Sequence, residues 1–502
     1  MHAYQELERR FARLSHLEDA LGILGWDKDA MMPIGAAPGR TDQIAALSVI
    51  HHDMLTAPDM PELLHRAAEE RDDDPDDDAR AWRKANLREM RRIHAHASAV
   101  PADLVEAASR AASSCEVAWR QARADSDFEG LLPLLSEVLR TQKLVGQAKG
   151  QALGLSVYDA LLDQYDPGNG TDLIDPVFDR LGRELPGLIA EVIEHQKRRP
   201  APLPLPGPFE VGTQEALGRT LMGVAGFDWT RGRLDVSTHP FCGGASSDVR
   251  ITTRYDENDA TGALMGVLHE TGHALYEQGR PERWLSQPVG RARGMSLHES
   301  QSLLIEMQAC RGDAFLGFLA PMLAAAFGGG DGAAWSAGNL RRTVQTVEPG
   351  TIRVDADEVT YPAHVLLRYR LERAMLDGDL ALRDLPGAFN DGLREMLGVE
   401  VPDDRRGCLQ DIHWPSGAWG YFPTYTLGAM IAAQLFDAAR RAIVGLDDRL
   451  AAGDFTGLLS WLRREVHERA SLHDSATLVT LATGRPLDAE VFTTHLRRRY
   501  LS

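Results

Sequence analysis

Apolar residues recur at intervals of three and four along most of the chain. Near the N-terminus this spacing is made by Leu7, Phe11, Leu14, Leu17, Leu21 and Leu24. It places the apolar side chains on one face of a helix, so we expect an amphipathic N-terminal helix. Helical spacing returns over residues 79–99 and 101–195, with a break at 166–170, where proline, glycine and asparagine cluster. The last part of the chain is again helical in pattern.

Strand patterns are short and few. Apolar and polar residues alternate around 233–237 and 251–254, which predicts two strands. The proline-rich stretch 200–208 is expected to be a stiff connector, with a motif for a partner domain as the alternative. The acidic run 71–78 is typical of a solvated loop that leads into a helix. The predicted fold class is therefore mainly α, with a small β-sheet.

Composition narrows the class of protein. The chain has 502 residues, 44% of them hydrophobic, and no low-complexity linker divides it. Its net charge of −19 argues against nucleic acid and anionic membranes as partners. There is no apolar run of membrane-spanning length and no secretory pattern, so we expect a cytoplasmic protein. The widely spaced cysteines, expected to be reduced, are Cys115, Cys242, Cys310 and Cys408.

The most informative motif is His269-Glu270-Thr271-Gly272-His273. Histidines four residues apart share one face of a helix and can bind one metal ion, while Glu270 is close enough to hold a water at that ion. The surrounding apolar positions predict a largely buried helix: Leu264, Met265, Leu268, Leu275 and Tyr276. Buried histidines need partners for their nitrogens, and a metal would provide one. The motif indicates zinc-dependent hydrolysis of a peptide bond.

A catalytic zinc takes three protein ligands and leaves one position open. We expect Glu299, on a second helical segment, to be the third ligand beside His269 and His273. A capping box between Ser296 and Glu299 is the alternative interpretation. His298 is a rival ligand, but its side chain points about 100° away from that of Glu299.

Further motifs occur before and after the metal motif, in this order along the chain: His239–Phe241, Asp248–Thr252, Ile352–Glu358 with Val359–Pro362, Gly407–Trp414 and Gly420–Gly428. Together with the two metal segments they resemble the M32 family of metallocarboxypeptidases, the Taq-type thermostable enzymes. The likeness runs from Trp26 to the C-terminal tail. Two features depart from the family pattern, namely Leu303, where arginine is common, and the arginine-rich segment with Arg291 and Arg293. They bear on substrate preference and on the packing behind the third ligand.

The resemblance implies one catalytic unit over residues 1–502, of the gluzincin kind. An N-terminal helical lobe (1–199) and a metal-site lobe (209–502) would flank a deep central groove with zinc on its floor and the small sheet beside the metal helix. It also implies broad specificity and a homodimer. One zinc ion per chain is expected, although a site of two histidines and one glutamate also accepts cobalt or manganese.

The chemistry assigns roles to further residues. Glu270 would act as general base and then as general acid. The developing oxyanion needs a second donor besides the ion. The candidates lie in the matching motifs: His413 and Tyr421 as catalytic residues, with Tyr425 at the substrate. Ordinary packing in an aromatic region is the alternative for all three.

A carboxypeptidase must also bind the free C-terminal carboxylate of its substrate. An arginine fork suits this task, and Arg250 and Arg353 lie in matching motifs. The alternatives are salt bridges, with Asp248 for Arg250 and with Asp355, Asp357 or Glu358 for Arg353. His239 is expected at the substrate because of its motif.

Partners of the metal-binding histidines are only loosely predicted. Asp357, Glu358 and Asp411 are candidates to accept their second ring nitrogens. The predicted function is a zinc metallocarboxypeptidase that removes C-terminal amino acids one at a time from peptides. A thimet-type endo-oligopeptidase is the main alternative. A helical scaffold with a structural zinc is the other, although such a zinc would be closed by a fourth protein ligand.

Overall fold

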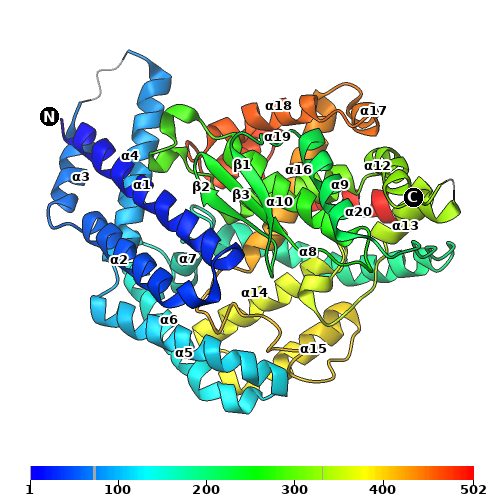
Figure 1. The fold of residues 1–502 in the computed structure, drawn as a ribbon. Coiled ribbons are helices and arrows are strands. Elements are labelled where there is room, and N and C mark those ends of the chain that lie inside the picture. The colour runs from blue at the N-terminus through cyan, green and yellow to red at the C-terminus, as the bar shows by residue number, and fades with distance from the viewer. Residues whose placement is uncertain (1, 72–74, 331) are drawn as a thin grey trace.

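The computed structural model describes residues 2–71, 75–330 and 332–502, most of which are helical (Figure 1). The first part forms helices α1 (Ala3–Ala30), α2 (Ala37–Leu55), α3 (Met60–Glu69), α4 (Asp77–Ser98), α5 (Ala102–Asp125), α6 (Phe128–Leu153), α7 (Val157–Leu162), α8 (Thr171–Gln196) and α9 (Val211–Ala225). Strands β1 (Gly232–Val236), β2 (Phe241–Ala245) and β3 (Asp248–Thr253) follow. The predicted class, mainly α with a small sheet, is confirmed.

The rest of the chain is helical to its end. It forms α10 (Gly262–Gln278), α11 (Gly294–Leu303), the π-helix η4 (Leu304–Cys310), α12 (Asp313–Ala326), α13 (Ala337–Val344), α14 (Tyr361–Asp377), α15 (Leu385–Leu397), α16 (Pro423–Ala442), α17 (Leu446–Ala451), α18 (Thr456–Glu465), α19 (Ser475–Thr483) and α20 (Ala489–Tyr500). Among the described residues no single helix has the length and apolarity of a membrane span. One pair, Pro288–Cys310 with Asp313–Ala326, meets these criteria only together and is bent by 75°.

Helix α1 contains the predicted N-terminal amphipathic stretch. Leu7, Phe11 and Leu14 are buried against α3 and α4, whereas Leu17 and Leu24 are half-buried. The burial decreases because this later part of α1 borders a cavity, which Ser15 and the two acids beyond it help to line. The hydrophobic pattern therefore predicted the helix but not the solvent-filled space on its face.

The acidic run before α4 is described only in part, since residues 72–74 lie outside the described residues. Asp76 accepts a hydrogen bond from the backbone N–H of Asp78 and so caps α4, as expected for a loop that leads into a helix. The predicted break at 166–170 separates α7 from α8. The proline-rich stretch has no helix or strand. The side-chain amide of Asn339 accepts from the backbone N–H of Leu203 and donates to its carbonyl oxygen.

The largest core cluster joins helices from both sides of the expected lobe boundary. It packs α5, α6 and α8 against α14, α15 and α20, with Leu181, Leu366 and Phe389 fully buried. A shared core of this kind fits one catalytic unit. The lobe boundary itself stays a prediction.

The sheet has the order β1-β3-β2, with β1 parallel and β2 antiparallel to β3. The sequence pattern predicted β1 and β3 to within a few residues but missed β2, whose two glycines weaken its strand signature. Val249 and Ile251 of β3 pack against Val267 and Ala274 of α10. The sheet therefore lies beside the predicted metal helix, as Figure 1 shows.

Candidate metal centre

Three side chains from two crossing helices meet at one point. His269 and His273 lie one turn apart on α10, and Glu299 lies on α11. The Glu299 Oε2 atom is 3.8 Å from His269 Nε2 and 3.4 Å from His273 Nε2. One ligand atom of each residue lies within 4.8 Å of the others. The structure thus brings together the three predicted metal ligands.

The close crossing of the helices requires small residues. At Gly272, inside the metal motif, a Cβ atom would lie 2.4 Å from the Gln301 carbonyl oxygen of α11. At Gly428 of α16, a Cβ would lie 2.7 Å from the Cβ of Glu299. A larger residue at Gly272 would push α11 away from α10, and one at Gly428 would push it away from α16, so the two glycines fix the position of the third ligand.

The second ring nitrogen of His269 has a carboxylate partner. Its Nδ1 lies 3.0 Å from Glu306 Oε2 on the π-helix, and Arg311 binds the other oxygen of Glu306. An ionised carboxylate only accepts hydrogen bonds, so Nδ1 donates and Nε2 is the nitrogen that faces Glu299.

His273 has a longer chain of partners. Its Nδ1 lies 2.6 Å from His298 Nδ1, and His298 Nε2 lies 2.9 Å from Glu277 Oε1. Arg280 holds Glu277 from the other side, 2.9 Å away. Because Glu277 accepts from His298 Nε2, a neutral His298 presents a lone pair at Nδ1 and accepts from His273. The Nε2 lone pair of His273 then also faces Glu299.

The charged groups of the cluster shift one another's pKa values. Burial by itself lowers the pKa of His269, but the nearby carboxylates Glu299 and Glu306 outweigh it and raise the pKa to about 10. Burial opposes ionisation of Glu299, yet His269 and His273 lower its pKa to about 2. Burial raises the pKa of Glu270 to about 7. A cation among these groups would replace the proton on His269.

The donor set fits a zinc ion. Ligand atoms about 2.1 Å from one tetrahedral ion stand about 3.4 Å apart, close to the separations of Glu299 Oε2 from the two histidines. Once a cation replaces the proton on His269, both histidines present a nitrogen lone pair to it. Within the described part of the chain, the cluster includes no fourth His, Cys, Asp or Glu, which is typical of a catalytic rather than a structural site.

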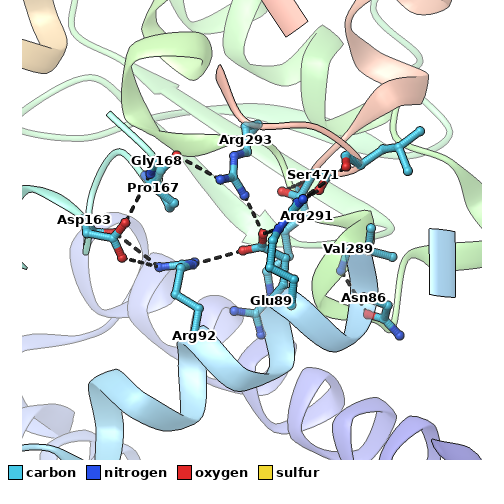
Figure 2. A network of polar contacts seen from close by, with 12 residues as sticks. Asn86, Glu89, Arg92, Asp163, Pro167, Gly168, Val289, Arg291, Arg293 and Ser471 are labelled. Carbon is cyan, nitrogen blue, oxygen red and sulfur yellow. Dashed lines mark hydrogen bonds and ion pairs between the residues drawn. The ribbon is translucent and has the colours of Figure 1, made fainter. Parts of the chain in front are cut away.

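The start of α11 is anchored from the N-terminal part of the chain. Figure 2 shows Arg293, just before α11, between Glu89 of α4 and the backbone at Pro167. Three residues further on, the Ser296 hydroxyl donates to Asp166 at 2.7 Å. Ser296 therefore does not form the capping box that was the alternative role for Glu299. Arg293 is itself buried and ties the start of α11 to α4 and to the segment before α8.

Arg353 is paired rather than free. Its Nε and Nη2 atoms lie 3.0 and 2.8 Å from Asp411 Oδ1, and its Nη1 donates to the Tyr361 hydroxyl at 2.8 Å. Arg368 also binds Asp411. The salt-bridge alternative named the wrong acids, because Asp357 caps the backbone before α14 and Glu358 binds His495. Asp411 was out of reach of sequence reasoning, since 58 residues separate it from Arg353.

Two other predicted substrate-binding residues are Arg250 and His239. Arg250 forms an ion pair with Asp248, its expected alternative partner, and its guanidinium lies 4.3 Å from the centre of the Trp26 ring. His239 is exposed in the turn between β1 and β2, where its carbonyl accepts from Ser237. Neither contact tests a role at the substrate, and both roles stay predictions.

The predicted aromatic group does assemble. His413 Nε2 lies 3.2 Å from the Tyr425 hydroxyl, and the rings of Tyr421 and Tyr425 are 5.2 Å apart. Burial lowers the pKa of His413 to about 4, so its ring is neutral at pH 7. Burial raises the pKa of Tyr421 and of Tyr425. The ionised Glu299 raises both further, as a smaller cause.

A cavity of about 540 Å³ opens beside this centre. Its inner end is lined by His298 and Tyr421, and its walls come from α1, from β2 and from the segment before α11. The half-buried Cys242 belongs to it, and all four cysteines are unpaired, as expected. The metal ligands are not among its lining residues, so a groove with the metal on its floor stays a prediction.

Sequence reasoning missed the partners of the histidines. Asp357, Glu358 and Asp411 bind other groups, so none of these candidates orients a metal histidine. Glu306 and Glu277 do so instead, the latter through His298. The one available signal was position: Glu277 lies eight residues after His269 on the same helix.

The fold and the site together define a class of protein: a helical hydrolase with two histidines and a downstream glutamate at one metal centre. The sequence model of the carboxypeptidase Taq (M32) metallopeptidases matches residues 6–500. The chain belongs to this family and is a metallocarboxypeptidase, a peptide hydrolase for which the family implies a divalent metal.

Individual relatives match over nearly their whole length. Thermostable carboxypeptidase 1 of Thermus thermophilus is 36% identical over 508 residues, which cover 99% of this chain and 98% of the relative. Carboxypeptidase 1 of Bacillus subtilis is 30% identical over 509 residues, which cover 100% of this chain and 98% of the relative. The solved structure of Trypanosoma cruzi metallocarboxypeptidase 1 superposes with a TM-score of 0.95 at 40% identity, covering 100% and 99% of the two chains. The comparisons give no support to a thimet-type endo-oligopeptidase.

Proposed function

We propose that this carboxypeptidase removes C-terminal amino acids one at a time, with broad specificity, at a zinc ion held by His269, His273 and Glu299. The observation that carries the proposal is the convergence of three ligand atoms within 4.8 Å beside a buried Glu270. When bound, zinc lowers the pKa of a coordinated water and polarises the scissile carbonyl. Cobalt or manganese would fit the same donors.

Glu270 is the proposed general base and acid. Its pKa of about 7 allows it to accept a proton from water and then to release it at neutral pH. It would deliver this proton to the departing amine. Its burial keeps bulk water from competing for the transfer. We assign Tyr421 and His413 to the opposite side of the substrate, where a hydroxyl or an imidazole N–H would stabilise the oxyanion.

The substrate carboxylate is proposed to bind at the group around Arg353. Arg353 and Arg368 share the single carboxylate of Asp411, which leaves an excess positive charge next to Tyr425 and Tyr361. Although burial opposes it, the two arginines hold the pKa of Asp411 well below its usual range, so at neutral pH the ionised Asp411 offsets one of the two positive charges and one remains. Arg250 and His239 would contact more distant parts of the peptide.

The test compares one peptide with a free C-terminus and its C-terminally amidated form. We expect single residues to be lost from the free peptide and the amide to resist. Glu270→Gln should keep the bound ion but lose about 10²–10⁴-fold in kcat. Arg353→Ala should raise KM for the free peptide, with Arg140→Ala, in an exposed ion pair on α6, as the control. Internal fragments, or equal turnover of the amide, would refute the carboxypeptidase assignment.

A homodimer is also proposed, on the basis of the family resemblance, and a cytoplasmic location is proposed separately. Light scattering on the purified chain, with a mass twice the 55.1 kDa of one chain expected, tests the dimer. A mass that stays at one chain across concentrations would exclude it. Fractionation of cells tests the location.

A further inference from the structure

A second cavity, of about 440 Å³, lies on the far side of the π-helix from the metal centre. Its walls come from the π-helix and from α12, α13, α16 and α20, which gather near the C-terminus (Figure 1). Gln308 of the π-helix lines it, whereas Glu306, two residues earlier, contacts His269. Side chains two positions apart on a helix face nearly opposite ways, so this cavity is separate from the peptide groove.

Arginines dominate the lining. Arg341, Arg440, Arg498 and Arg499 face the cavity, against the acidic side chains Asp313 and Asp447. A smaller neighbouring cavity of about 240 Å³ shares Arg498 and adds Arg485, together with Asp437 and Glu490, which pair with Arg441 and Arg180. The larger cavity thus has four arginines against two aspartates, with Ser502 also in its lining, in a chain whose net charge is −19.

The acids account for only part of this charge. Asp313 lies 3.3 Å from Arg341, Asp447 lies 2.9 Å from Arg440, and Arg499 binds Glu358 outside the cavity. Within the described part of the chain, Arg498 forms no hydrogen bond or ion pair. Burial and the neighbouring Arg440 lower the pKa of Arg498, although Asp437 and Asp447 oppose this.

We propose that this cavity binds a small multivalent oxyanion of the phosphate or diphosphate class. Arginine forks bind such oxygens with paired, charge-assisted hydrogen bonds. Arg341, Arg440 and Arg499 are already held in place by their own partners, so little side-chain freedom is lost on binding. Arg498 supplies the uncompensated charge, and the volume lies in the range of small-ligand sites. The site does not depend on the peptidase assignment.

Calorimetric titration of the full chain with inorganic pyrophosphate, at fixed ionic strength, tests the site. Metal is removed first, because pyrophosphate also binds zinc. We expect saturable one-to-one binding, tighter than that of phosphate. Arg498→Ala should weaken it about tenfold, the loss of one charge-assisted interaction. Arg498→Lys, which keeps the charge but loses the fork, should fall between the two.

The matched control is Arg140→Ala, which removes the same charge from an exposed pair with Glu137 on α6. It should leave the affinity within about twofold. Absence of saturable binding, or an equal loss in both alanine variants, would overturn the proposal. Arg498 reaches solvent, so its replacement should leave the unfolding midpoint unchanged. Should it unfold the chain, Arg440→Lys provides the same comparison.

Discussion

Arg293 and Glu89 form an ion pair almost wholly inside the protein, with Nη1 2.7 Å from Oε1 and each side chain less than 5% exposed (Figure 2). The pair joins α4, near the N-terminus, to the residue that precedes α11. Glu89 also accepts from Arg92, which reaches on to Asp163. The third metal ligand therefore depends on a helix some 200 residues away in the sequence.

Breaking this pair should destabilise the protein and weaken metal binding together. Glu89→Gln leaves the Arg293 charge buried without its counter-ion, at an expected cost of about 3–5 kcal/mol in the free energy of unfolding. Urea unfolding and zinc titration measure the two effects. Arg120→Ala, which removes an exposed ion pair with Glu116 on α5, should cost less than about 1 kcal/mol. Equal effects of the two changes would contradict the assigned role.

Glu306→Gln should lower zinc affinity about 10–100-fold, because it weakens the acceptor that orients His269. Competition with a chelator at pH 7 measures this loss. Glu194→Gln, on the exposed face of α8, is the control for the changed charge and should have no effect. An unchanged affinity in Glu306→Gln would show that the π-helix does not act on the metal centre.

Glu372 is expected to make the protein less stable as the pH rises. Burial raises its pKa from 4.5 to about 8, although hydrogen bonds from Trp414 and Tyr158 oppose this. Between these values the native protein holds a proton that the unfolded chain has released. The free energy of unfolding should then fall by up to about 1.4 kcal/mol per pH unit.

The neutral variant Glu372→Gln removes this dependence. It should be more stable than the wild type at pH 8 and show a flatter profile between pH 5 and 8 in urea unfolding. Glu395→Gln serves as a control on the exposed side of α15. A wild-type profile as flat as that of the Gln variant would mean that Glu372 is ionised in the native state.

Acid should destabilise the protein through two buried histidines. Burial lowers the pKa of His364 and of His467 from 6.5 to about 3. Below pH 6.5 the unfolded chain binds protons that the native protein does not. The free energy of unfolding should therefore drop by up to about 1.4 kcal/mol per pH unit for each histidine, down to pH 3.

His364→Gln should reduce this acid slope, whereas replacement of the exposed His65 by Gln should not. Urea unfolding at pH 7, 6, 5 and 4 with saturating zinc gives the comparison. The same slope in His364→Gln and in the wild type would show that His364 is already protonated in the native protein.

The sequence by itself determined the helices and the core of the metal centre. Apolar periodicity is a local property, so it predicted α1, the break before α8 and the strands β1 and β3. The spacing of His269 and His273 placed both on one helical face for the same reason. The short and glycine-containing β2 left no such pattern.

Only the tertiary structure decided which distant groups meet. Arg353 pairs with Asp411 and not with the acids closer to it in the sequence. Glu306 and His298 are the hydrogen-bond partners of the metal histidines. Arg498 lies with other arginines around a cavity. The physical reason is that an ion pair or a hydrogen bond needs a few ångströms of separation and a suitable angle. Helix packing sets both, through close approaches such as those at Gly272 and Gly428.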